Sequence, residues 1–250
     1  MLPCAMHCVG RVILSTPGEA PLPGRKQSGR ALKEQVKTLL QADDFRERLA
    51  EWERFSGRQV INPLFSFLCS TNEQLKWRAV AAIGRVVARL AEEDRESARV
   101  VMRRFIWNLN DESGGIGWGA PEAMGEIMAC HEGLASEYGH ILVSYISPEG
   151  NLLEHEELQC GVLWGLGRMA RSRPHLLRDA VPHILPYLTD GNKRLRGLAT
   201  WILGALPNPS SDAALQALLH DVSEVVIHSE GKQMVLRICD LAAQALAVKI

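Results

Sequence analysis

Long apolar runs, cysteine clusters and strand patterns are scarce in this sequence. No stretch of about 18 or more uncharged apolar residues occurs, so we predict no transmembrane helix. The six cysteines are too few and too scattered for a disulfide framework in a chain of 250 residues, which favours a reducing, cytoplasmic location. No segment has the alternation of a strand, so we predict that the secondary structure is helical throughout.

Catalytic and metal-binding motifs are also missing. The sequence has no HExxH, CxxC, GxSxG or P-loop pattern, and its serine, histidine and aspartate residues are too dispersed to nominate a triad. His155, five residues before Cys160, is the nearest approach to a histidine and cysteine pair. We therefore expect no cofactor and no metal ion, and we favour a non-catalytic protein over an enzyme.

What the sequence does contain is a repeat. Four segments share an apolar residue followed by a glycine nine positions later, and successive glycines lie 41, 42 and 37 residues apart. A period of this length is typical of stacked helical hairpins, in which each unit buries its apolar face against its neighbours. Such an array usually offers an extended binding surface. The four pairs are Leu75 with Gly84, Ile116 with Gly125, Leu158 with Gly167, and Leu195 with Gly204.

Helix-breaking residues divide the chain into units. Residues 1–29 are rich in Pro, Gly and Ser and are predicted to be a disordered N-terminal extension, whereas 30–250 are predicted to form a single solenoid domain. A fifth unit is predicted from Val235 and Gln244, which repeat the nine-residue spacing without the glycine. The predicted helices cover 31–40, 43–55, 57–69, 73–91, 94–109, 117–133, 135–147, 154–172, 174–189, 193–206, 211–220 and 232–249.

The phrases VAAIGRVVA and LWGLGRMA in the second helices resemble the HEAT-repeat family, and in particular the short repeats of proteins similar to phycobilisome lyases. The resemblance covers roughly residues 57–249. It implies an all-α fold, an α-α superhelix built as a right-handed solenoid of helical hairpins with the second helices on its concave side. The segment DESGGIGWGAPEAMGEI resembles the signature of a small group of uncharacterised bacterial HEAT proteins.

On a helical wheel, the second helix of each unit has two contrasting faces. One face is an apolar stripe that we predict to pack on the partner helix, and the opposite stripe carries the repeat glycines, four tryptophans and several charges. We expect the glycines to mark close approach between helices. The tryptophans either fill the core between repeats or line a concave binding groove. The candidate binding residues on this stripe are Trp77, Arg85, Trp118, Glu122, Glu126, Trp164, Arg168 and Trp201.

The segment 110–122 is the least repeat-like part of the array. It contains Asp111, Glu112 and Glu122 together with several glycines and Trp118, where the other repeats have a short polar turn. These residues, with His155, are candidate binding residues because glycines permit a close backbone approach to a ligand. A structural interpretation is equally open, in which Asp111 or Ser113 caps the next helix and Pro121 occupies its first turn.

Charge is distributed in bands although the net charge is only −1. Between Leu109 and Cys160 there are ten acidic residues and no lysine or arginine, and both flanking regions are net basic. In a stacked array these bands predict an acidic middle between basic ends, unless the charges are simply solvated. A continuous acidic zone argues against binding along a nucleic acid.

Two functional hypotheses follow. The first is a cytoplasmic, non-catalytic adaptor or regulator that binds another protein or a peptide segment along the concave stripe of tryptophans and charges. The alternative is an accessory lyase, or a protein that handles a small molecule or cofactor at a site around the 110–122 loop, with His155 and Cys160 nearby. We expect no nucleic-acid or membrane partner, and the sequence leaves the oligomeric state open.

Overall fold

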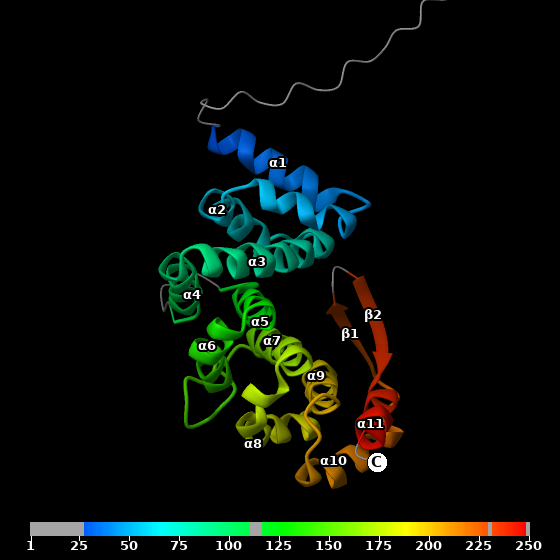
Figure 1. The fold of residues 1–250 in the computed structure, drawn as a ribbon. Helices are drawn as coiled ribbons and strands as arrows, with labels where there is room; N and C mark the ends of the chain where they lie inside the picture. Colours follow the sequence, from blue (N-terminus) through cyan, green and yellow to red (C-terminus); the bar gives the residue numbers. More distant parts are fainter. Residues whose placement is uncertain (1–27, 111–116, 230–231, 249–250) are drawn as a thin grey trace, which may run out of the picture.

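The computed structural model describes residues 28–110, 117–229 and 232–248, which form a stack of helices with a β-hairpin before the last helix (Figure 1). The α-helices and strands are α1 (Gly29–Gln41), α2 (Gly57–Leu68), α3 (Glu73–Glu93), α4 (Arg95–Leu109), α5 (Ala120–Cys130), α6 (Glu132–Ser144), α7 (Glu156–Ser172), α8 (Val181–Ile184), α9 (Lys193–Leu203), α10 (Asp212–Ala217), β1 (Glu224–Ser229), β2 (Lys232–Arg237) and α11 (Ile238–Ala247). They are connected in part by 3-10 helices at Glu47–Arg54, Pro174–Leu176, Arg178–Ala180, Leu185–Thr189, Pro209–Ser211 and Leu218–His220.

The helices form an α-α superhelix, as the repeat predicts. The second helices α3, α5, α7, α9 and α11 pack successively on one another, while α4, α6 and α8 lie on the opposite side (Figure 1). The apolar stripe is confirmed in the first repeat, where Leu75, Ala79, Ile83, Val86 and Leu90 are all buried. Buried apolar side chains form one core cluster that runs through the stack.

Three of the four repeat glycines mark close approach between inner helices. A Cβ atom on Gly84 would lie 2.6 Å from Cγ of Glu126 in α5. A Cβ atom on Gly125 would overlap the backbone of Gly165 in α7, and one on Gly167 would overlap the ring of Trp201 in α9. The prediction of close approach is therefore confirmed at these positions, whereas Gly204 has room for a methyl group.

Helix ends explain most differences from the predicted boundaries. Gly119 has a φ of 76°, a left-handed conformation that favours glycine, so α5 begins at Ala120 rather than at 117. Pro121 occupies the first turn of α5, in agreement with the structural interpretation of this loop. The predicted helix 174–189 is broken into four short pieces, because its prolines lack the N–H that an uninterrupted helix requires.

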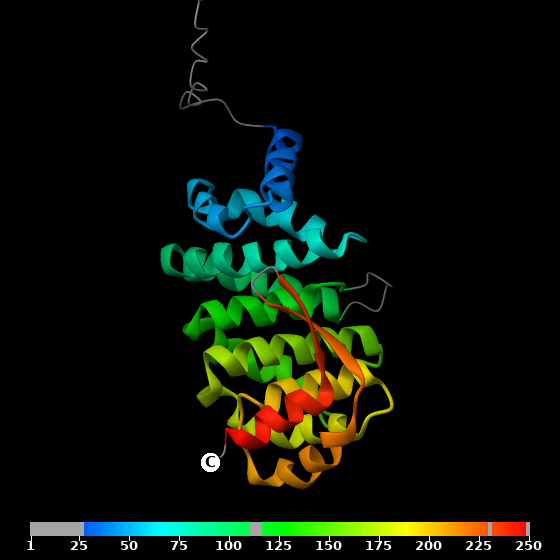
Figure 2. The same ribbon diagram turned by 90° about the vertical axis from the view of Figure 1, so that its right-hand side faces the viewer.

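The predicted absence of strands is wrong. β1 and β2 form an antiparallel hairpin, and the predicted helix 232–249 begins only at Ile238, so Val235 lies in β2. Val225 and Ile227 are buried while Val226 is exposed, which is the period-two alternation of a strand that covers a surface with one face. Figure 2 shows this hairpin crossing over the inner helices. Helix α11 nevertheless packs on α9, where the predicted fifth unit would place its second helix.

Two further expectations concern the ends of the chain and the membrane. The predicted disordered extension lies almost entirely outside the described residues. Within the described ranges, no helix combines the length and apolar character needed to cross a bilayer.

Candidate functional site

Two cavities lie along the inner helices α3, α5 and α7, on the side of the stack that we call the concave face. One, here called the arginine cavity, has a volume of about 640 Å³ and lies at the C-terminal ends of the inner helices. The other, here called the tryptophan cavity, has a volume of about 410 Å³ and lies at their N-terminal ends, beside the hairpin. Between the two, His228 and Ser229 of β1 face Trp77, Ala81 and Trp164 across a small gap.

Tryptophans of the inner helices hold the hairpin in place. The Nε1–H of Trp164 donates a hydrogen bond of 2.8 Å to the main-chain carbonyl oxygen of His228. The ring of Trp77 stacks on the imidazole of His228, with 4.2 Å between ring centroids and 10° between planes. Trp77 also packs against Trp164, with 4.7 Å between centroids. These indoles therefore bind an extended backbone and its side chain, although both belong to the same molecule.

Burial disfavours the protonated form of His228. Desolvation between the indoles lowers the pKa of His228 to about 4. Glu73 opposes this effect, and the nearby positive charges of Lys76 and Arg194 reinforce it. Protonation of this imidazole would therefore weaken its contact with the array.

The tryptophan cavity combines indoles with buried charge. Lys76 Nζ lies 3.0 Å from a carboxylate oxygen of Glu122, which is only 6% exposed. Burial alone would lower the pKa of Lys76, but the Glu122 carboxylate outweighs this and raises it. The half-buried Trp118 forms an outer wall. The other residues that line this cavity are Glu73, Trp77, Gly119, Glu157, Leu158, Cys160, Gly161, Trp164, Arg194, Leu198, Val226, His228 and Gln233.

His155 and Cys160 do not form a nucleophilic pair. Nδ1 of His155 accepts a hydrogen bond of 3.2 Å from the backbone N–H of Glu157, which caps α7, and its ring meets Trp118 edge to face. Burial raises the pKa of the Cys160 thiol to about 11, so the reactive thiolate is scarce at neutral pH. Within the described residues, no cluster of three or more histidines, cysteines or carboxylates is arranged to hold a metal ion.

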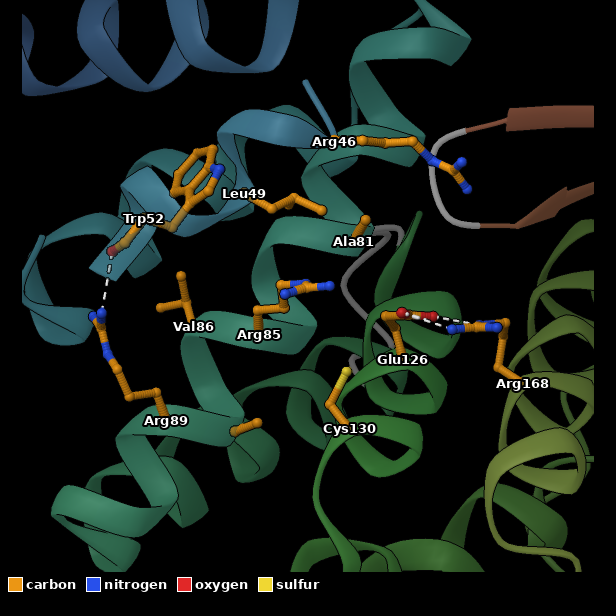
Figure 3. A pocket seen from close by; sticks show the side chains of 11 residues that line it. Arg46, Leu49, Trp52, Ala81, Arg85, Val86, Arg89, Glu126, Cys130 and Arg168 are labelled. Carbon is orange, nitrogen blue, oxygen red and sulfur yellow. Dashed lines mark hydrogen bonds and ion pairs between the residues drawn. The ribbon is translucent and has the colours of Figure 1, made fainter. Parts of the chain in front are cut away.

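The arginine cavity is open and mainly cationic (Figure 3). Arg46 and Arg85 extend into it from the N-terminal side, and across from them Arg168 holds Glu126 through two hydrogen bonds of 2.6 and 3.0 Å. Arg89 donates a hydrogen bond of 3.2 Å to the carbonyl oxygen of Trp52. The remaining lining residues are Leu49, Ala81, Val86, Ala88 and Cys130.

Ion pairs across the repeats account for the charge bands. Five glutamates of the acidic band pair with basic residues that lie between 37 and 46 positions away, about one repeat along the chain. Half of the ten acidic residues in the predicted acidic middle are therefore paired with its basic flanks. The pairs are Lys76 with Glu122, Arg95 and Arg99 with Glu137, Arg168 with Glu126, Arg173 with Glu132, and Arg194 with Glu157.

The structure sorts the candidate binding residues into groups. Trp77, Trp118, Glu122 and Trp164 line the tryptophan cavity, and Arg85, Glu126 and Arg168 line the arginine cavity. Trp164 and Trp201 are each only 4% exposed, but Trp201 lines neither cavity and packs over Gly167, so it belongs to the core. His155 caps α7, and Asp111 and Glu112 lie outside the described residues. The sequence did not reveal Arg46, Trp52, Lys76, Arg194 and His228 as cavity residues.

The fold defines the chain as a helical-repeat solenoid, and residues 157–206 match the family model described as HEAT-like repeat. An uncharacterised protein of Archaeoglobus fulgidus is 28% identical over 181 residues, which are 71% of this chain and 84% of that protein. A designed armadillo repeat protein is similar in structure, with a TM-score of 0.53 and 16% identity, covering 90% of this chain and 94% of that one.

A second designed armadillo repeat protein, solved in complex with the peptide (KR)4, is similar with a TM-score of 0.50 and 17% identity. The alignment covers 86% of this chain and 98% of that chain. At this level of identity the similarity concerns the fold alone.

Proposed function

We propose that this protein is a non-catalytic adaptor or regulator that binds an extended segment of another protein on its concave face. The observation that carries the proposal is the contact between Trp164 and the main-chain carbonyl of His228. An indole donor that bonds a backbone carbonyl recognises an extended chain without regard to its sequence. The cavities on either side of this contact have the volumes of ligand pockets and supply side-chain selectivity.

Two further observations support a peptide segment as the partner. The tryptophan cavity places indoles beside Arg194, and tryptophan and arginine are enriched where proteins bind one another. A structural relative was solved with a bound peptide, as its description states. The alternative of a cofactor-handling site gains nothing from the described residues, because His155 caps a helix and Cys160 has a raised pKa.

The test is selection of a random peptide library, displayed on phage, against the wild-type protein. Selected peptides are then measured for binding to Trp118→Ala, to Arg85→Glu and to the control Trp107→Ala. Trp107 is a suitable control because it is 74% exposed on α4, on the opposite side of the stack. We expect peptides that lose affinity for a concave-face variant and keep it for the control.

The proposal fails if the library yields no binder, or if every selected peptide binds both concave-face variants as tightly as the wild type. Glu122 is left unchanged because its buried pairing with Lys76 would make a substitution there a test of folding. Thermal melting of each variant confirms that the array is folded.

A further inference from the structure

The arginine cavity carries more positive charge than its own carboxylate neutralises. Of the arginines that line it, Arg168 pairs with Glu126 inside the cavity and Arg89 pairs with Glu93 beside it. The two oxygens of Glu126 are both engaged by Arg168, so this carboxylate is already paired. Arg85 is exposed on α3, and no carboxylate of the described chain lies within ion-pair distance of its guanidinium. The N–H donors of the Arg85 guanidinium therefore have no anionic acceptor within the described chain.

A buried donor on the cavity wall is also without an acceptor. Trp52 is 2% exposed, and its Nε1–H has no hydrogen-bond partner among the described residues. A buried polar group left unpaired carries a free-energy cost. A ligand that brings an acceptor to this wall would remove that cost.

The walls of the cavity are not uniformly polar. Leu49, Ala81 and Val86 lie between the arginines (Figure 3). A compact inorganic anion would use the guanidinium groups and leave these apolar surfaces in water. A peptide in which an acidic residue adjoins an apolar one would use both, and the cavity volume of about 640 Å³ is within the range of pockets that hold such ligands.

We propose that the arginine cavity binds an aspartate or glutamate side chain of the partner segment, with Arg85 as its principal contact and the apolar wall as the site of an adjacent apolar residue. The planar guanidinium matches a carboxylate through two parallel hydrogen bonds. Glu126 repels an anion from its own side of the cavity, which directs the ligand's carboxylate towards Arg85. This inference rests on the proposed function and specifies the chemistry of the segment bound.

The experiment uses a short fluorescent peptide of alternating Glu and Leu, a matched peptide of alternating Gln and Leu, and fluorescence polarisation. We expect the Gln peptide to bind at least about tenfold more weakly to the wild-type protein, since a charge-assisted pair of hydrogen bonds is lost. Arg85→Ala should weaken binding of the Glu peptide by a similar factor. Arg85→Lys should weaken it by less, because lysine keeps the positive charge but lacks the planar pair of N–H donors.

Arg103→Ala is the matched control, because Arg103 is an exposed arginine on α4 that pairs with Glu96 outside the cavity. Equal affinity for the two peptides, or unchanged affinity in Arg85→Ala, overturns the inference while a peptide selected from the library still supports the proposed function. Failure of every peptide overturns both.

A third arm distinguishes a free anion from an acidic segment. Inorganic phosphate and glutarate are added separately while the melting temperature is followed. If either anion raises the melting temperature of the wild type and not of Arg85→Ala, and the Glu peptide does not bind, the occupant is a small anion and the inference is overturned.

Discussion

Gly125 of α5 and Gly165 of α7 meet backbone to backbone, so that a Cβ atom on Gly125 would overlap the Cα atom of Gly165. Glycine inside a helix costs roughly 1 kcal/mol relative to alanine. Glycine is nevertheless required here, because a side chain at Gly125 would prevent the two inner helices from approaching so closely. The resulting close packing also places the charged side chains of one repeat beside those of the next.

Gly125→Ala should destabilise the protein by at least about 3 kcal/mol, because neither backbone can move without separating the repeats. Gly204→Ala is the matched control at the same position of the fourth repeat. There the nearest atom to an added Cβ is 3.4 Å away and φ is −62°, so we expect stabilisation of about 0.4–1 kcal/mol. Urea denaturation measures both values, and equal effects would contradict the assignment of Gly125 to a helix contact.

Glu126→Leu should cost about 3 kcal/mol, because it removes the carboxylate that accepts two hydrogen bonds from the half-buried guanidinium of Arg168. The double variant Glu126→Leu with Arg168→Met should recover most of that loss, since both charges of the pair are then absent. A double-mutant cycle by chemical denaturation tests this. Additive losses would show that the two side chains act independently.

Acid should release the hairpin through His228. The folded pKa of His228 is about 4, below the value of about 6.5 that histidine has in an unfolded chain. Its contribution to stability is therefore fully present above about pH 6.5 and is lost as the pH falls towards 4. Melting temperature should fall more steeply over this range in the wild type than in His228→Phe. The exposed His220→Phe serves as the control and should follow the wild type.

Trp164→Phe should loosen the hairpin while the stack stays folded. Phenylalanine retains most of the apolar contact but loses the Nε1–H that bonds the His228 carbonyl, a loss of about 1 kcal/mol. Hydrogen exchange followed by mass spectrometry should show faster exchange in 224–229 and little change in α5. Trp107→Phe, at an exposed position, should alter neither region.

The thiols should differ in reactivity. Cys160 is buried and its pKa is raised to about 11, whereas Cys69 is exposed. Iodoacetamide at neutral pH should therefore modify Cys69 well before Cys160, and the difference should vanish in guanidinium chloride. Peptide mapping by mass spectrometry gives the two rates. Faster modification of Cys160 than of Cys69 would contradict this prediction and indicate a reactive cysteine in the tryptophan cavity.

The sequence predicts the stack well because the repeat glycines and the apolar stripe obey local rules. Both the helix period and the close approach at Gly84 can be read from spacing. The β-hairpin was not predicted, because the alternation of buried and exposed residues around Val225 and Ile227 is short. The repeat spacing also favoured a helix across Val235. From the sequence alone, a six-residue strand and the helix of a fifth repeat unit are hard to distinguish, because tertiary contacts decide between them.

The candidate site was predicted only in part for a similar reason. Arg85, Glu126 and Arg168 recur at related positions of the repeat and were found from the helical wheel. Arg46 and Trp52 lie in the non-repeating segment before α2, and His228 lies on the hairpin, so no periodicity connects them to the concave face. Their roles arise from packing between segments distant in sequence.

The ion pairs spaced by one repeat also fix the order of the units. Glu126 is complementary to the unit that follows it, and Glu122 to the unit that precedes it, so no repeat can be duplicated or exchanged without setting charges against the wrong neighbour. Unlike an array of identical modules, this one has a defined order of neighbouring units. Exchanging two units would break these pairs, so each cavity forms at one defined position along the stack.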